Sequence, residues 1–411
     1  MPVHVTSEIG RLRTVVVHTP GPELLAVTPS TKEDFLYDDI IDLETARREH
    51  RRFVAVLERF CRVLQARELL VDVLQEPGAR ELLVRTTMDV VPSEPLARDI
   101  EELPAAAVAE RLIEGAPQAQ GPLARTLNET SYALPPMPNL FFTRDTAMAV
   151  GEHVLIGSMR YGIRWSEELL MKAIFAHHPA LAGRGILYDG SEERRPNHTL
   201  EGGDVHVLRR DTVMIGFSER SSPSAIDHLA ELLFAQGGVE NIIVVVMPAE
   251  NTAIHLDMIF TQVDRGQCVV YPPHFLGAER LPVLLWRKGQ TQLTSMPDVF
   301  AALRACGLPM EPVCCGGDRR IMQEREQWAS GCNFVALRPG LVVSYERNEE
   351  TLRALERAGF AVVPALAVLT GEARVGDDQR AVITVPGGEL VRGGGGPRCM
   401  TCATEREDPW T

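Results

Sequence analysis

The sequence predicts a mixed α/β protein in which units of two strands and one helix repeat along the chain and surround a common centre. The chain has 411 residues, 45% apolar and 24% charged, which is the composition of a folded globular protein. From residue 139 onward, one pattern repeats along the chain. Each copy consists of a polar residue, two apolar strand-like runs, and then an arginine or a helix. The copies are separated by on the order of 50 to 75 residues, as in propeller-like repeats.

The elements ahead of these repeats can be placed from their residue patterns. Residues 13–18 are largely β-branched and favour a strand, and Pro20-Gly21 favours a turn after it. Residues 43–68 carry apolar side chains at three- and four-residue spacing, which predicts an amphipathic helix. Residues 75–130 are rich in Ala, Glu, Arg and Leu and are interrupted by prolines, so we expect a helical insertion of short helices.

The repeats themselves each join polar residues to a pair of strands. They span Asn139 to Arg164, Glu201 to Arg220, His255 to Tyr271, and Asn333 to Arg347. Helices with capping residues or glycine stops are expected between them, near 165, over 225–234, and from Asn348 to Gly359. A ring of such units would collect a polar set at its centre: Asp145, Glu201, Asp204, His255 and Asp257.

Charge and hydropathy exclude several classes of function. With 42 basic and 56 acidic residues, the net charge of −14 repels phosphate and argues against nucleic-acid binding. No apolar run approaches the roughly 18 residues needed to span a bilayer. The first residues lack an apolar signal region, so we expect a soluble, cytoplasmic protein. Eight cysteines are too sparse for a disulfide scaffold.

Asp145 and Asp257 stand in apolar, strand-like surroundings. Burial of an isolated carboxylate costs several kcal/mol unless a cation meets it. One interpretation is a structural salt bridge, for example between Asp145 and Arg144. The other is a ligand site, because Glu201 and Asp204 add further carboxylates that would attract a metal, a guanidinium or an amine.

His255 and Asp257 lie two residues apart on an expected strand, where their side chains would share one face. A carboxylate there would raise the pKa of His255 and suit it to acid–base chemistry. The same residues with Glu201 and Asp204 would also suit a divalent ion, but no second histidine stands at a ligand spacing. The remaining histidines of this region are expected at the surface: His177, His178 and His198.

The segment 391–402 ends in Pro-Arg-Cys-Met-Thr-Cys after a run of four glycines. A phosphate cradle would need Gly-Lys-Ser/Thr, which is absent. Cys399 and Cys402 have no second cysteine pair for zinc and no thioredoxin-like context for redox chemistry. The remaining interpretation is a nucleophilic Cys399 whose thiolate is stabilised by Arg398.

Taken in order, these segments resemble the arginine deiminase family of the guanidino-group-modifying superfamily. The resemblance covers nearly the whole chain. It implies one catalytic domain over residues 1–411, folded as a five-bladed pseudo-symmetric α/β propeller, with 75–130 as a helical insertion. The matching motifs are Ser7–Thr14, His18-x-Pro-Gly21, Tyr37–Ile40, Pro138–Asp145, Tyr161–Arg164, Leu200–Asp204, His255–Asp257 and Gly395–Cys402.

The resemblance implies hydrolysis of L-arginine to L-citrulline and ammonia, with no cofactor and no metal. Cys399 would attack the guanidinium carbon and form an amidino-thioether, while Asp145 and Asp257 hold the guanidinium nitrogens. His255 would protonate the departing ammonia and then activate water, with Glu201 orienting it. The positions matching substrate-binding residues are Leu36, Asn139, Phe142, Arg164 and Arg220.

One position departs from the family pattern. Where the family usually has Arg-Gly-Arg-Gly-Gly, this chain has Gly394 in place of the second arginine. Either Arg392 or Arg398 fills that role, or the substrate differs at its α-carbon end. Two other functions therefore stay open: a deiminase or amidinotransferase for another guanidine, and a guanidine-binding protein without turnover. We expect a homo-oligomer with a small guanidino substrate and neither nucleic-acid nor membrane partners.

Overall fold

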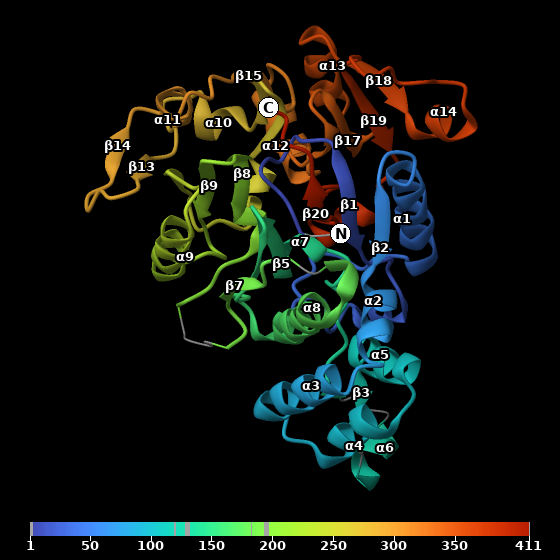
Figure 1. Ribbon diagram of the computed structural model, residues 1–411. Coiled ribbons are helices and arrows are strands. Elements are labelled where there is room, and N and C mark those ends of the chain that lie inside the picture. The colour runs from blue at the N-terminus through green and yellow to red at the C-terminus, as the bar shows by residue number, and fades with distance from the viewer. Residues whose placement is uncertain (1–2, 119–120, 128–131, 182, 193–196, 411) are drawn as a thin grey trace.

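The computed structural model describes residues 3–118, 121–127, 132–181, 183–192 and 197–410 of this mixed α/β protein. In Figure 1 the sheets and most helices form the upper part of the molecule, and a group of short helices lies below them. No helix among the described residues is both long enough and apolar enough to cross a bilayer.

Five sheets of three to five strands, together with a two-stranded ribbon, account for the described strands. Each of the five contains an antiparallel pair with a third strand parallel to one of its members. The three strands that form this arrangement are, sheet by sheet, β20 (Cys402–Arg406), β1 (Leu12–Val17) and β2 (Arg62–Gln65); β5 (Ala147–Val150), β6 (His153–Ile156) and β7 (Ile186–Asp189); β8 (Val205–Arg209), β9 (Thr212–Phe217) and β10 (Asn241–Val246); β11 (Phe260–Asp264), β12 (Gln267–Val270) and β15 (Glu311–Cys314); β16 (Val335–Arg338), β17 (Leu341–Tyr345) and β19 (Ala381–Val385).

Two of these sheets carry further strands at an edge. The third sheet continues through β13 (Val283–Arg287) and β14 (Thr294–Met296), and the fifth through β18 (Ala361–Pro364). The first sheet joins the two ends of the chain, because β1 pairs with β20.

The helices between strands largely follow the sequence pattern. Those expected near residues 165, 225 and 349 are present as α8 (Trp165–His177), α9 (Pro223–Gln236) and α13 (Glu349–Arg357). The single helix expected over 43–68 is wrong, because α1 (Leu43–Leu57) ends before the chain enters β2, and α2 (Ala66–Val73) follows. Val63 and Leu64 pair with β1, so sheet formation overrides the helical pattern.

The proline-interrupted stretch contains α3 (Pro77–Val90), α4 (Glu94–Glu102), α5 (Ala105–Glu114) and α6 (Pro122–Leu127), with a ribbon of β3 (Ala116–Pro117) and β4 (Tyr132–Leu134). Prolines stand in the first turn of α3 and α4, where a missing N–H costs nothing. Figure 1 shows these helices together at one end of the molecule, next to α2 and α8. The apolar faces of α3, α4 and α5 share one buried cluster with α2 and α8.

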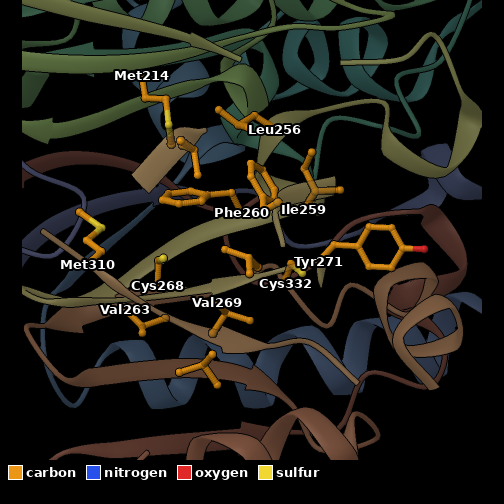
Figure 2. Close-up of a cluster of buried hydrophobic side chains, with 14 of the residues drawn as sticks. Met214, Leu256, Ile259, Phe260, Val263, Cys268, Val269, Tyr271, Met310 and Cys332 are labelled. Atoms are coloured by element: carbon orange, nitrogen blue, oxygen red, sulfur yellow. The ribbon is translucent and has the colours of Figure 1, made fainter. Parts of the chain in front are cut away.

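The largest core cluster surrounds β11 and β12 and is shown in Figure 2. It buries Leu256 and Ile259, which flank Asp257 in the chain, and Cys332, which precedes Asn333. Burial of each such aliphatic side chain is worth about 1.5–3 kcal/mol. The segments that carry Asp257 and Asn333 are therefore anchored in the core.

Candidate active site

The polar residues of the site come from equivalent places in the five sheets. Each lies just before one strand of an antiparallel pair, ahead of β5, β8, β11, β16 and β20. In that order the residues are Asp145, then Glu201 and Asp204, then His255 and Asp257, then Asn333, and then Cys399. All are buried.

The backbone around His255 is not the strand that the sequence suggested. Residues Leu256–Met258 form a short 3-10 helix, η6, preceded by extended His255. The carboxylate of Asp204 accepts a hydrogen bond from the Leu256 N–H at 2.9 Å, and Ser218 and Ser221 donate to its other oxygen at 2.6 Å. Asp204 thus holds the turn, and His255 and Asp257 contact different partners.

His255 lies between two carboxylates. Its Nε2 is 2.8 Å from Glu201 Oε2, and its Nδ1 is 3.7 Å from Asp145 Oδ1. Burial disfavours the imidazolium, but Asp145 and Glu201 outweigh it and raise the pKa of His255 to about 9. Gly203 is required here, because a Cβ would lie 2.6 Å from the His255 ring. His255 is therefore protonated at neutral pH and suited to act as an acid.

Asp145 sits in a one-turn helix, α7 (Thr143–Thr146), rather than in a strand. Its Oδ2 accepts a hydrogen bond from Arg164 Nη1 at 2.7 Å, whereas its buried Oδ1 has no hydrogen-bond partner among the described residues. The salt bridge considered between Asp145 and Arg144 does not form, because Arg144 pairs with Glu8 at 2.9 Å.

Asp257 repeats this arrangement on the other side of the site. Its Oδ2 accepts a hydrogen bond from Arg398 Nη1 at 2.8 Å, and its Oδ1, also buried, has no described hydrogen-bond partner. Each of the two aspartates thus has one oxygen held by a buried arginine and one oxygen without a hydrogen bond.

The Cys399 thiol lies beside Asp257. Its Sγ is 3.6 Å from Asp257 Oδ2 and 3.1 Å from Asn333 Nδ2. Asn333 Oδ1 accepts a hydrogen bond from the Arg398 N–H at 2.8 Å, so one amide fixes both the sulfur and its loop. Sequence reasoning did not single out Asn333, although it opens the fourth repeat.

Arg398 lowers the pKa of Cys399, in the expected direction, but it does not decide the net shift. Burial is the largest cause, and the charges of Asp257 and Asp145 add to it, so the pKa of Cys399 lies well above its ordinary value. Arg398 lowers it only weakly, since its guanidinium is engaged by Asp257 and Glu8. This raised pKa favours the neutral thiol of Cys399 in the site without a ligand.

A cavity opens onto Cys399, His255 and Asp145. Asp257 lies next to the sulfur that lines it, with Oδ2 3.6 Å from Sγ. All five residues expected to bind substrate line this cavity, together with Ile254, Met258 and glycines 393–395; they are Leu36, Asn139, Phe142, Arg164 and Arg220. Leu36 has a left-handed φ of 65° in the segment 28–42, which we call the rim segment. Asn139 Nδ2 holds that segment by donating to the Phe35 carbonyl at 2.8 Å.

The two cavity arginines are already paired with carboxylates. Arg164 binds Glu167 at 2.8 Å as well as Asp145. Arg220 binds Glu219 at 2.6 Å and Glu201 at 3.4 Å, and its guanidinium stacks 4.8 Å from the Tyr161 ring centre. Both are buried, so the cavity walls are held in place by ion pairs.

The departure at Gly394 lies on the cavity wall. Gly394 has a left-handed φ of 83°, and a Cβ there would meet no atom within 4 Å. Arg392 does not reach in, because it pairs with Asp39 of the rim segment at 2.9 Å. Cys402 is buried, and its thiol donates to the Ala147 carbonyl at 3.2 Å. His198, expected at the surface, is buried and 3.2 Å from Ser224 Oγ.

Asp145, Glu201 and His255 place ligand atoms within 4.8 Å of one another, as a metal site would. A metal-bound imidazole must be unprotonated at the ligating nitrogen, whereas the raised pKa of His255 favours the imidazolium. The donor set thus fits an acid–base group between carboxylates better than a resident metal ion.

Comparison with known proteins identifies the fold and the family of the chain. The fold matches the N-terminal domain of ArgZ with a covalently bound reaction intermediate, at a TM-score of 0.53 and 14% identity over 96% of this chain and 98% of that one. The same domain with bound product, described as an arginine dihydrolase from cyanobacteria, matches at 0.53 and 14% over 96% and 97%. A dimethylarginine dimethylaminohydrolase in adduct with S-methyl-L-thiocitrulline matches at 0.51 and 13% over 95% and 99%. The model of the arginine deiminase family matches residues 33–406, and the chain therefore belongs to that family.

Proposed function

We propose that the protein hydrolyses L-arginine to L-citrulline and ammonia through a covalent amidino-cysteine intermediate. One observation carries this proposal. Two buried aspartates beside a cysteine each keep one carboxylate oxygen without a hydrogen bond among the described residues. Such oxygens cost free energy unless a ligand supplies donors, and a planar guanidinium supplies N–H groups on both sides of its carbon.

Binding of the guanidinium would prepare the nucleophile. Asp145 Oδ1 and Asp257 Oδ1 would accept hydrogen bonds from different guanidinium nitrogens and place the central carbon near the sulfur. The added positive charge would offset the two aspartates that raise the pKa of Cys399, so the thiol loses its proton when substrate is present. Free enzyme would then keep an unreactive thiol.

The chemical steps would divide between Cys399 and His255. The thiolate would attack the guanidinium carbon, and protonated His255 would give its proton to the departing nitrogen, which leaves as ammonia. Neutral His255 would then take a proton from a water that attacks the amidino carbon. The carbon–sulfur bond would break and release citrulline, with the thiol restored. Glu201, 2.8 Å from His255, would hold the ring in place throughout.

The same family relation supports finer proposals on architecture. We infer that the five sheets are the blades of a pseudo-symmetric propeller, because each contributes site residues from the same place. Residues 1–411 would form one catalytic domain with 75–130 as its helical insertion. We also keep the expectations of a homo-oligomer and of a cytoplasmic location as proposals.

A second candidate is a deiminase or amidinotransferase that acts on another guanidine. Gly394 and the outward Arg392 favour it, because the cavity wall has no cation at position 394. Arg164 and Arg220 remain to hold a carboxylate, although both are already paired. Arginine stays the first candidate because those two arginines still line the cavity.

The test is incubation of the purified protein with arginine, agmatine and other guanidines, with ureido product and ammonia measured. We expect citrulline and ammonia from arginine in equal amounts. The Cys399→Ala variant should bind arginine in calorimetry but form no product, while Cys402→Ala, a matched buried cysteine, should retain turnover. Turnover of another guanidine without citrulline, or a new guanidine on an added amine, would replace the first candidate with the second. Binding without turnover in the wild type would indicate a guanidine-binding protein.

A further inference from the structure

Glu8, near the start of the chain, is buried at the centre of the molecule and joins two arginines. Arg144 Nη2 lies 2.9 Å from its Oε2, and Arg398 donates from Nε to Oε2 and from Nη2 to Oε1, both at 3.2 Å. Burial alone would raise the pKa of Glu8, but the two guanidiniums outweigh it and lower that pKa. Glu8 is therefore a carboxylate at any pH where the protein works.

These two arginines adjoin the residues that do the chemistry. Arg144 precedes Asp145, and its backbone N–H donates to the Cys399 carbonyl at 3.1 Å. Arg398 precedes Cys399 and binds Asp257. Glu8, Arg144, Arg398 and Asp257 carry two negative and two positive charges, so the buried group is neutral as a whole.

The guanidinium of Arg398 is divided unequally between its two carboxylates. Glu8 takes Nε and one hydrogen bond from Nη2, and the Val205 carbonyl takes another from Nη2 at 2.8 Å. Nη1 is left for Asp257, which it meets through Oδ2 at 2.8 Å, and it also donates to the Gly203 carbonyl at 3.4 Å. A guanidinium facing a single carboxylate prefers a bidentate pair. Without the charge on Glu8, Arg398 would turn toward Asp257 and occupy both oxygens.

We propose that Glu8 is a positioning residue for the guanidinium site: it restrains Arg398 so that Asp257 Oδ1 stays free for the ligand. The inference rests on the proposed function only in taking a planar cation as the ligand. It assigns to Glu8, some 390 residues from Arg398 in sequence, control over how strongly the site holds that cation.

The test compares two alkylating reagents that react at Cys399. A haloacetamidine carries a planar cation, and iodoacetamide is neutral; in both reactions the sulfur displaces the halide. The ratio of their rate constants at Cys399, followed by mass spectrometry, reports whether the carboxylates attract the cation. For Glu8→Gln we expect that ratio to fall at least about tenfold, the effect of one lost charge-assisted hydrogen bond. The iodoacetamide rate should change much less.

A matched control separates this role from a structural one. Glu326 is also buried and accepts hydrogen bonds from Glu350 N, Thr351 N and Thr351 Oγ1, remote from the cavity. Glu326→Gln should lower the melting temperature and leave the ratio unchanged. An unchanged ratio in folded Glu8→Gln would overturn the proposal, as would a wild type without preference for the amidine.

If Glu8→Gln does not fold, the double variant Glu8→Gln/Arg144→Met restores neutrality to the buried group. We expect it to recover stability but keep the reduced ratio. A double variant with the wild-type ratio would contradict the proposal. Because the readout needs no turnover, a wild type that prefers the amidine but makes no citrulline would refute the proposed function and leave this inference standing.

Discussion

Each of the two aspartates of the site is paired with a buried arginine that is itself paired with a glutamate, but the residues of the two groups come from different distances along the chain. Asp145 is paired with Arg164, which is backed by Glu167 three residues further along, and both lie at the start of one helix. Asp257 is paired with Arg398, which is backed by Glu8 from the opposite end of the chain. The Asp145 side is thus built locally, whereas the Asp257 side exists only after the chain ends have come together.

This difference has a consequence for what each side does. Arg164 lines the cavity and can contact a ligand while it holds Asp145. Arg398 is enclosed behind Cys399 and does not line the cavity. On the Asp145 side, Arg164 can therefore both contact a ligand and hold the aspartate. On the Asp257 side, Arg398 holds the aspartate but is not exposed to the cavity.

The largest expected effects come from Asp145→Asn and Asp257→Asn. Each removes one carboxylate that would hold the guanidinium, so each should lower kcat/KM for the guanidine substrate by about 10³-fold. Stability should differ between them. Asp257→Asn leaves Arg144 and Arg398 with only Glu8, an uncompensated buried charge that costs about 3–5 kcal/mol. Asp145→Asn leaves Arg164 paired with Glu167 and should cost much less.

Steady-state kinetics and urea unfolding measure both quantities. Equal losses of stability in the two variants would show that local and long-range support are equivalent here. A wild-type kcat/KM in either variant would remove that aspartate from the site.

The same contrast explains what could be predicted from the sequence. The repeats alone predict a common centre for Asp145 and His255, whereas Arg164 and Cys399 are assigned to that centre only by the resemblance of their motifs to the arginine deiminase family. Glu8 lies within the Ser7–Thr14 motif, but its partners Arg144 and Arg398 are far away in sequence. No local sequence pattern predicts an ion pair between such distant residues. Arg398 is recognised as a cationic neighbour of Cys399, but its ion pairs with Glu8 and Asp257 are not predicted, for the same reason.

Backbone conformation at the site was the other weak point. Residues 256–258 have the alternating pattern of a strand. In the structure they form a 3-10 helix, and the Leu256 N–H donates a hydrogen bond to the Asp204 carboxylate. The strand pairs themselves were predicted well, because β-branched runs and glycine stops are local signals. Hydrogen bonds between residues far apart in sequence set the conformation of the short turns that carry the polar residues. The spacing of apolar residues along the chain does not predict such bonds.

A second prediction concerns pH and the Asp145 side. The pKa of His255 is raised from 6.5 to about 9, so the folded protein binds the imidazolium proton more tightly than the unfolded chain does. The resulting stability, about 3 kcal/mol, is fully present below pH 6.5 and is lost as pH rises through 9. Activity that needs the His255 imidazolium should decline over the upper part of the same range.

The two aspartates should affect this titration unequally. Asp145 raises the pKa of His255 and Asp257 is not among the main causes. In Asp145→Asn the decline in stability should therefore move to lower pH, and in Asp257→Asn it should stay near 9. Urea unfolding between pH 6 and 10, with the His255→Gln variant as the baseline, measures the shift. A decline that moves equally in both variants would contradict the assignment of His255 to the Asp145 side.

The smallest effect is expected at the rim, where neither kind of buried support applies. Arg392 is 45% exposed in its pair with Asp39, and such pairs contribute at most about 1 kcal/mol. Arg392→Ala should therefore change stability no more than Arg319→Ala, which breaks another exposed pair, with Glu350. Its KM for arginine should stay within about threefold of wild type, because one exposed pair carries so little free energy and the side chain is directed at the rim segment. A tenfold or larger rise in KM, measured beside the Arg319→Ala control, would mean that Arg392 turns inward on binding and replaces the arginine that the family usually has at the position of Gly394. The substrate would then be held from three regions of the chain instead of two.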